Sequence, residues 1–101
     1  MKFGLKPEDL ELLEELLFSP LRKHHSKIWI FGSRARGDYK PFSDIDILYQ
    51  IPKNYTITLS DISDIKERLE QSNLAYKVDI VNIEDLAESY VEEILKDRVQ
   101  I

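Results

Sequence analysis

Cysteine is absent from the 101-residue sequence, and so are long apolar runs. The lack of cysteine excludes disulfides, thiolate zinc sites and a cysteine nucleophile, and it suits a reducing cytoplasm. No apolar stretch approaches the ~20 residues of a membrane-spanning helix, and acidic residues interrupt the N-terminal segment where a signal peptide would be apolar. We therefore expect a cytoplasmic protein that does not contact a membrane.

Basic residues are also few, because 14 Lys and Arg stand against 19 Asp and Glu and give a net charge of −5. Sequence-independent binding of nucleic acid needs many cationic contacts to phosphates, so no direct nucleic-acid partner is expected. The charge is uneven: residues 32–43 carry three basic side chains against one acidic, whereas residues 61–101 carry five basic and eleven acidic ones. The short basic segment can hold a phosphate group within an acidic protein.

The chain is long enough for one domain, residues 1–101, and its apolar fraction of 43% is near that of ordinary globular proteins. We expect no span to be left over for a separate acceptor-binding domain. A molecule that this protein modifies would then come on a second chain, or bind at the shared edge of an assembly, which predicts a hetero-oligomer.

Hydrophobic periodicity predicts four helices and three strands. In chain order, the expected elements are a helix from Pro7 to Pro20, a strand at 27–31, a short helix at 33–36, a strand at 44–50, a helix at 60–71, a strand at 75–81 and a helix at 84–96. This order, α-β-α-β-α-β-α, predicts an α/β fold (α+β in strict classification) with a small mixed β-sheet packed against helices.

Individual residues set the expected helix boundaries. Pro20 is expected to end the first helix. Thr58 and Asp61 have the spacing of a capping box, and Asn82 can cap the last helix. Apolar residues at helical spacing are expected to form the buried side of that last helix: Leu86, Tyr90, Val91, Ile94 and Leu95.

A glycine–serine pair follows the first predicted strand directly. Gly32 lets a ligand approach the backbone closely, and a helix that begins at Ser33 would point its unbonded N–H groups, with the Ser33 hydroxyl, at an anion. The same residues also fit an ordinary strand-to-helix turn with Ser33 as the N-cap. The pair is therefore a candidate phosphate site with a plain structural alternative.

Two aspartates, Asp44 and Asp46, lie two residues apart on a predicted strand. Side chains at that spacing point to the same face, with Cα atoms about 6.5 Å apart. Carboxylates held so close repel each other unless a cation lies between them, and Mg²⁺ fits because it takes oxygen ligands and keeps positions open for phosphates. The alternative is a turn aspartate followed by an exposed strand aspartate, or a strand start capped by Ser43 and Asp44.

A third aspartate, Asp79, interrupts the apolar strand Val78-Asp79-Ile80-Val81. An isolated charge in such a strand is costly to bury without a partner or a metal. If this strand neighbours the one that carries Asp46, three carboxylates come together and can hold two divalent cations. The alternative is an edge-strand aspartate that faces solvent.

These features together resemble the DNA polymerase β-like nucleotidyltransferase superfamily, and especially its minimal nucleotidyltransferases, the MNT proteins. The resemblance lies in Gly32-Ser33, ten further residues and then Asp44-Ile-Asp46, within the segments GSRARG and SDIDIL, and in the acidic strand around Asp79. It covers almost the whole chain and implies the nucleotidyltransferase fold.

The resemblance implies an enzyme that transfers AMP from ATP to a hydroxyl of a HEPN-domain RNase toxin, in characterised members a tyrosine, and that acts as the antitoxin. Two other functions stay open. One is a non-enzymatic antitoxin that neutralises the toxin by binding it. The other is a transferase for a small molecule such as an aminoglycoside.

The resemblance also assigns roles to residues. Gly32 and Ser33 would bind the ATP phosphates, with weaker candidates in Arg34 and Arg36.

The metal would be held by the three aspartates. Asp44 and Asp46 would bind two Mg²⁺ ions, with Mn²⁺ as the other candidate metal, and Asp79 would complete the site and can also act as general base. His24 and His25 lie outside the motif and are expected at the surface.

Overall fold

The computed structural model describes residues 2–101. Its helical segments are α1 (Pro7–Leu13), the π-helical η1 (Glu14–Phe18), α2 (Ser19–Arg22), α3 (Ser33–Arg36), α4 (Leu59–Glu70), the 3₁₀ turn η2 (Ile83–Asp85) and α5 (Glu88–Asp97). Its strands are β1 (Lys27–Phe31), β2 (Ile45–Gln50), β3 (Val78–Asn82) and β4 (Val99–Gln100).

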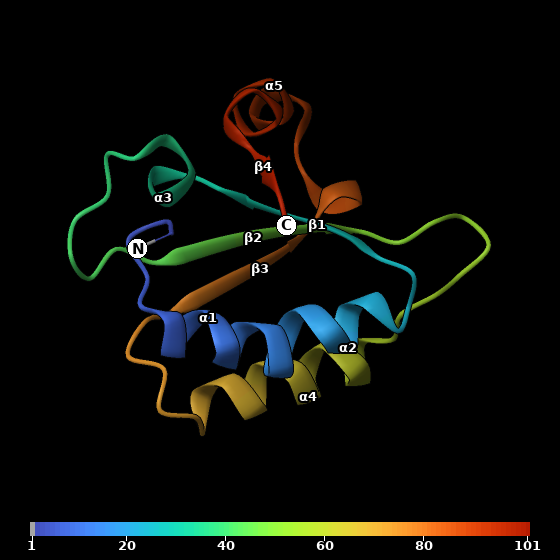
Figure 1. Ribbon diagram of the computed structural model, residues 1–101. Helices are drawn as coiled ribbons and strands as arrows, with labels where there is room; N and C mark the ends of the chain where they lie inside the picture. Colours follow the sequence, from blue (N-terminus) through green and yellow to red (C-terminus); the bar gives the residue numbers. More distant parts are fainter. Residues whose placement is uncertain (1) are drawn as a thin grey trace.

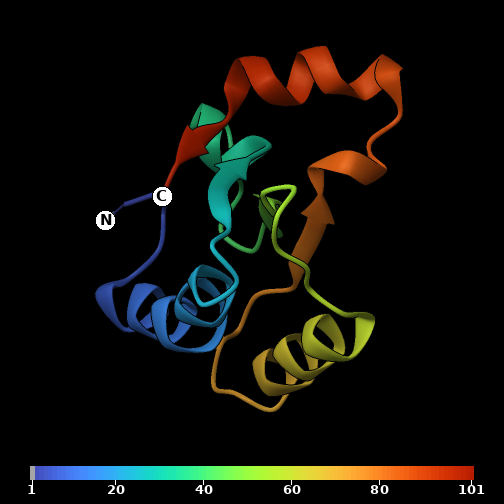
Figure 2. The same cartoon turned by 90° about the vertical axis from the view of Figure 1, so that its right-hand side faces the viewer.

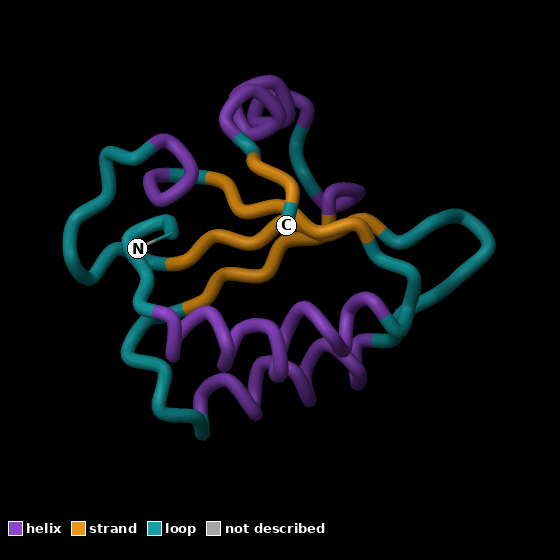
Figure 3. Tube along the Cα trace, in the orientation of Figure 1, coloured by secondary structure: helices purple, strands orange, loops and turns teal. Residues whose placement is uncertain are grey.

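The four strands form one mixed sheet in the order β3-β2-β1-β4. Strand β2 pairs antiparallel with β1 and parallel with β3, and β4 pairs antiparallel with β1. Helices α1, α2 and α4 cover one face of the sheet, whereas α3 and α5 lie over the other (Figures 1 and 3). The mixed α/β architecture predicted from the sequence is confirmed.

The alternation of side chains along β2 separates the core from the opposite face. Ile45, Ile47 and Tyr49 belong to the buried cluster that also contains residues of α1 and α4, such as Leu13 and Ile65. Because successive strand residues point to opposite faces, the residues between them point away from this cluster. Figure 2 shows the resulting layers edge-on, with the helical layer below the sheet and α5 above it.

The first helix does not end at Pro20, which corrects the prediction. A π-helical turn ends at Phe18, where the Ser19 N–H donates to the Glu14 carbonyl, and the helix continues to Arg22. Pro20 thus follows a widened turn and takes an early position of α2, where its missing N–H costs no regular intrahelical bond. The helix is therefore two residues longer than the sequence indicated.

The last helix, by contrast, is shorter and less buried than predicted. Asn82 caps only the 3₁₀ turn, by accepting from the Glu84 N–H, and α5 begins at Glu88 after extended residues. None of the residues of α5 is buried, and Tyr90 is 62% exposed. The main core lies on the other side of the sheet, so Val91, Ile94 and Leu95 of α5 are only partly buried.

The strands differ from the sequence prediction at three boundaries and by one additional strand. Strand β2 begins at Ile45 rather than at residue 44, and β3 spans Val78–Asn82 rather than 75–81. Tyr76 lies outside β3, which begins at Val78, and its ring stacks on the Arg34 guanidinium with 4.6 Å from ring centroid to guanidinium carbon. Strand β4 was not predicted, since two residues are too short to show a periodic pattern. Across residues 2–101, no helix combines the length and the hydropathy that crossing a membrane requires.

The predicted capping box of α4 is confirmed and yields a stability test. The Asp61 N–H donates to Thr58 Oγ1 at 3.0 Å, and the Thr58 N–H donates to Asp61 Oδ2 at 3.1 Å. We expect Thr58→Ala to lower the free energy of unfolding by about 1 kcal/mol, measured by urea denaturation at pH 7. Ser63→Ala, at an exposed position of the same helix, is the control and should change it far less.

The same box predicts a pH dependence. Hydrogen bonds from Thr58 lower the pKa of Asp61 below its ordinary value. A depressed pKa stabilises the fold above the unfolded-state pKa of about 3.9, and this contribution is lost as the pH falls through the folded value. Asp61→Asn removes the titrating carboxylate and should therefore flatten the loss of stability in acid, and an unchanged slope would contradict the assignment.

Candidate active site at the carboxylate pair

The site begins with the turn between β1 and α3. Gly32 has φ = 74° and takes the N-cap position, and its carbonyl accepts from the N–H groups of Ala35 and Arg36. Ser33 is the first residue of α3 rather than its cap, so the alternative with Ser33 as N-cap does not hold. The turn presents the Gly32 backbone and Ser33 together at the end of β1.

Gly32 is required by space as well as by backbone conformation. A Cβ atom at this position would collide with the Asp46 Oδ2 oxygen and lie 3.2 Å from Asp46 Cγ. The carboxylate of Asp46 therefore packs directly against the glycine turn. Two parts of the motif, separated by thirteen residues, meet in the fold.

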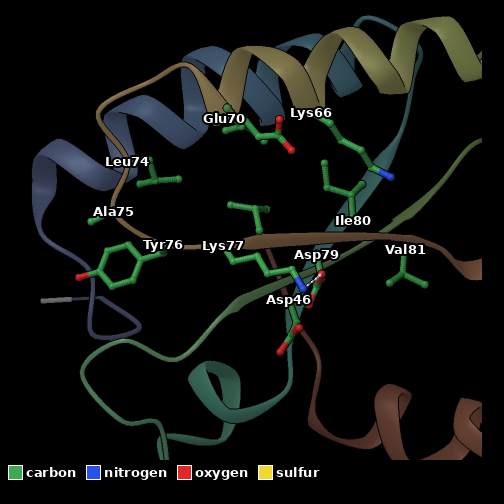
Figure 4. Close-up of a pocket in the computed structure, with 12 residues that line it drawn as sticks. Asp46, Lys66, Glu70, Leu74, Ala75, Tyr76, Lys77, Asp79, Ile80 and Val81 are labelled. Atoms are coloured by element: carbon green, nitrogen blue, oxygen red, sulfur yellow. Dashed lines mark ion pairs between the residues drawn. The ribbon is translucent and has the colours of Figure 1, made fainter.

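Asp46 and Asp79 lie directly opposite each other in the parallel ladder of β2 and β3. Opposed residues of such a ladder share a face, and Figure 4 shows both side chains on the side of the sheet away from α4. The strand that carries Asp79 therefore lies next to the strand that carries Asp46, which was the condition for bringing the two carboxylates together. Asp44 precedes β2 by one residue and is exposed.

The electrostatics of Asp46 tie the three carboxylates together. Burial raises the pKa of Asp46, and the negative charges of Asp79 and Asp44 raise it further. The positive charges of Arg36 and Lys77 act in the opposite direction. Lys77 Nζ lies 3.6 Å from Asp79 Oδ1, which makes it the nearest cation of the pair.

The donor chemistry of this cluster suits a hard divalent cation, because every side chain in it offers carboxylate oxygens. Asp46 and Asp79 come together directly, whereas Asp44 reaches the pair only through its charge. Over the part of the chain that the structure describes, no three His, Cys, Asp or Glu side chains are close enough to hold a metal. Metal binding by the three aspartates stays a prediction.

Arg34 has a structural position rather than the phosphate contact that the resemblance assigned to it. Its side chain is 2% exposed. Nε and Nη2 donate to the Ser43 carbonyl at 3.0 and 2.8 Å, and Nη1 donates to the Phe3 carbonyl at 3.0 Å. Arg34 therefore joins α3 to the N-terminal turn and to the residue before Asp44.

Two aromatic rings enclose the same guanidinium. Its carbon lies 5.2 Å from the ring centroid of Tyr39 and 4.6 Å from that of Tyr76. Cation–π contacts of this kind favour a desolvated cation. The sequence did not indicate this role, because the ring and carbonyl partners of Arg34 are distributed from residue 3 to residue 76.

Arg36 lies near the carboxylates, and its positive charge acts on Asp46. Its Nε donates to Asp38 Oδ2 at 3.2 Å, and its Nη1 lies 3.6 Å from Asp97 Oδ2 at the end of α5. The side chain is partly exposed, so a contact with a phosphate stays a prediction. Sequence reasoning missed Lys77, although its spacing of two from Asp79 would have placed both on one face of an extended segment.

The two histidines lie elsewhere. His24 Nδ1 is 3.1 Å from the Thr56 carbonyl, and His25 stacks on Tyr55 with ring centroids 3.8 Å apart. These partners are not part of the carboxylate pair.

A pocket of about 630 Å³ adjoins the carboxylate pair. It is lined by Asp46, by residues 74–81 and by Lys66, Leu69 and Glu70 of α4 (Figure 4).

Comparison with known proteins assigns the chain to a family. The sequence pattern of the family described as "Polymerase beta, Nucleotidyltransferase" matches residues 19–101. This span contains the glycine–serine turn and all three aspartates. The protein belongs to the polymerase β-type nucleotidyltransferase family.

Individual relatives agree with this assignment. The chain is 28% identical over 100 residues to the "Probable protein adenylyltransferase MntA" of Haemophilus influenzae, covering 99% of this chain and 84% of that protein. It is 31% identical over 86 residues to a provisionally named protein adenylyltransferase of Methanocaldococcus jannaschii, covering 76% of this chain and 85% of that one. A solved structure described as a minimal nucleotidyltransferase superposes with a TM-score of 0.70 and 31% identity, covering 96% and 97% of the two chains.

A more distant structure shares the fold. It is described as a tri-AMPylated HEPN toxin of Shewanella oneidensis in complex with an MNT antitoxin. The matched chain has a TM-score of 0.62 and 19% identity, covering 95% of this chain and 71% of that one.

The packing of Gly32 against Asp46 predicts unequal effects of two glycine substitutions. Gly32 and Gly37 both have positive φ, at 74° and 90°, but a Cβ at Gly37 would meet no atom within 4 Å. Gly37→Ala should lose about 1–2 kcal/mol of stability from its left-handed backbone, and Gly32→Ala about 1–3 kcal/mol, because φ of 74° with ψ of −156° is a region that essentially only glycine occupies. Only Gly32→Ala should also displace Asp46 and abolish nucleotidyl transfer, and equal activity of the two variants would contradict this packing.

The burial of Arg34 predicts a large loss of stability on its removal. Arg34→Met should lower the free energy of unfolding by roughly 3 kcal/mol, because carbonyls that now accept from a cation are left buried without a donor. Arg34→Lys keeps the charge but lacks the planar guanidinium, so its free energy of unfolding should lie between those of the wild type and Arg34→Met. Arg36→Met, in the same short helix, should be close to wild type in urea denaturation.

Proposed function

We propose that this protein transfers AMP from ATP to a tyrosine hydroxyl of a HEPN-domain toxin and thereby neutralises it. The observation that carries the proposal is the opposition of Asp46 and Asp79 on parallel strands, with the Asp46 carboxylate against the Gly32 turn. That arrangement places anionic oxygens beside a turn suited to phosphates. The names of the adenylyltransferase relatives and the AMPylated toxin bound to a structural neighbour support the choice of acceptor.

The reaction is a nucleotidyl transfer with a simple balance of atoms. The acceptor oxygen forms a bond to the α-phosphorus of ATP, the bond from that phosphorus to the bridging oxygen breaks, and pyrophosphate leaves. The hydroxyl proton passes to a base. Asp79 suits this role because it lies on the edge strand, next to Asp46 and open to an incoming group.

The residues of the turn would hold the nucleotide. Backbone N–H groups after Gly32 and the Ser33 hydroxyl are donors for phosphate oxygens, and the positive charge of Arg36 lies nearby. Asp44, Asp46 and Asp79 would hold Mg²⁺, which neutralises phosphate charge when bound and aligns the attacking and leaving oxygens. Burial and the negative charges of Asp79 and Asp44 raise the pKa of Asp46, and the repulsion among these carboxylates favours a cation at this position.

Removal of the carboxylates tests the proposal. Asp46→Asn and Asp79→Asn should each lower AMP transfer to the HEPN-domain partner, for Asp79→Asn by about 10²–10⁴-fold if it serves as general base. The measurement is transfer of label from α-labelled ATP in the presence of Mg²⁺. Asp64→Asn on the exposed side of α4 is the matched control and should retain activity.

A double variant distinguishes an enzymatic antitoxin from one that acts by binding alone. We expect the Asp44→Asn/Asp46→Asn double variant to form the complex with the partner, as judged by size-exclusion chromatography, yet to fail to protect cells from the toxin. Full protection by this variant would favour a non-enzymatic antitoxin. Efficient labelling of a small hydroxyl compound, but not of the partner, would favour a small-molecule transferase.

A further inference from the structure

Strand β3 forms an open edge of the sheet. Among residues 2–101 it pairs only with β2, in the order β3-β2-β1-β4. The Ile45 N–H donates to the Lys77 carbonyl, and Val78 lies opposite Ile45. In a parallel ladder that starts this way, Lys77 and Asp79 direct their bonding groups to β2, so the N–H and carbonyl groups of Val78 and Ile80 point outward. These outward groups can pair with another strand.

The pocket beside the carboxylates follows this edge. Its lining includes every residue from 74 to 81, which is β3 together with the segment that leads into it. Lys66, Leu69 and Glu70 of α4 form the wall on one side, and Asp79 and Asp46 line the other (Figure 4). The pocket is therefore a groove along the unpaired edge of β3, with Asp46 and Asp79 on one flank.

We infer that this groove binds the acceptor as an extended polypeptide that adds a strand to the outer edge of β3. The inference rests on the proposed function for the nature of the acceptor. Backbone pairing with Val78 and Ile80 would supply much of the binding, as in other cases where a peptide extends a sheet. The acceptor side chain would then be held in register with Asp79.

The spacing of the strands explains why such a site takes tyrosine. Neighbouring strands lie about 4.8 Å apart, so an added strand is one spacing from Asp79 and two spacings from Asp46. The hydroxyl of serine or threonine is attached to Cβ and would stay beside its own strand. The ring of a tyrosine opposite Asp79 carries its hydroxyl across the Asp79 position toward Asp46.

The opposite face of the added strand meets the wall formed by α4. Residues on either side of the acceptor tyrosine would point to that face. Ile80 and Leu74 are partly buried against the core there, and Leu69 is buried. We therefore expect apolar residues immediately before and after the tyrosine.

A second copy of this chain is a less suitable occupant. Asp79 belongs to the edge strand itself and lines the groove. A permanent partner strand would cover the side from which an acceptor reaches Asp79, whereas an acceptor segment enters and leaves. The experiments below include this alternative as an outcome that overturns the inference.

A peptide series tests the backbone pairing directly. The probe is a library of nine-residue peptides with a central tyrosine and varied flanks, presented to the full chain with labelled ATP and Mg²⁺. The best peptide is then N-methylated at one position at a time. Blocking an N–H that faces β3 should reduce labelling about tenfold, as expected for one lost hydrogen bond, and blocking the alternate N–H groups should change it little.

The outcomes of this series are distinct. A period of two in the N-methyl profile, with loss of labelling when serine replaces tyrosine, supports the groove. A flat profile, or no peptide bound at all, overturns it. Anisotropy of a dye-labelled peptide measures binding without turnover. Peptide binding with the period of two but without AMP transfer would contradict the proposed function while leaving the groove in place.

A substitution at the edge provides the second test. Val78→Pro removes an outward N–H and leaves the hydrogen bonds to β2, since proline is tolerated where the strand N–H faces outward. Val78→Thr keeps that N–H and the β-branched shape, so the comparison of the two isolates the backbone group. We expect Val78→Pro to label the peptide about tenfold less than Val78→Thr, with equal binding of a fluorescent ATP analogue.

Equal peptide labelling by the two variants would overturn the inference. If Val78→Pro does not fold, as judged by circular dichroism, the N-methyl profile decides alone. Native mass spectrometry of the wild-type chain completes the design. A homodimer that dissociates in Val78→Pro would identify a second copy as the occupant and would also overturn the inference.

Discussion

The enforced approach of Asp46 and Asp79 is the contact on which the rest of the site depends. Pairing of β2 with β3 places two carboxylates side by side, and burial together with the negative charge of Asp79 raises the pKa of Asp46. Such a contact requires compensation nearby, and Lys77 and Arg36 supply positive charge. It also leaves no room for a side chain at Gly32. The strand register thus creates one unfavourable pair, and the glycine and the nearby cations accommodate it.

Sheet geometry keeps this charged cluster apart from the core. Ile45 and Ile47 are fully buried against the helical layer, while Asp46 between them points to the other face. A slip of one residue in β2 would bury the carboxylate and expose the isoleucines, so the core that stabilises the fold also holds the site in register. Arg34 completes this coupling, because it binds the loop before Asp44 to α3 through the Ser43 carbonyl.

The position of β3 at the edge of the sheet makes it accessible to another polypeptide. The strand contributes Asp79 to the carboxylate pair and still has one side without a neighbour. Unpaired strand edges invite pairing and are commonly guarded by charged residues, and here Lys77 and Asp79 occupy the edge strand and its approach. A site on an edge strand can thus be reached by another polypeptide without any opening of the core. This accessibility links the position of Asp79 in the sheet to the kind of acceptor proposed.

The sequence by itself determined the strand at Lys27–Phe31, the glycine turn, the capped helix α4 and the candidate set of aspartates. These depend on local signals: a β-branched run, a glycine–serine pair directly after it, a Thr58–Asp61 box and charges within apolar strands. Only the tertiary structure decided that β3 lies beside β2, that Arg34 is buried between Tyr39 and Tyr76, and that α5 stays half-exposed. Each of these depends on contacts between residues far apart in the chain, whose energies no local pattern encodes.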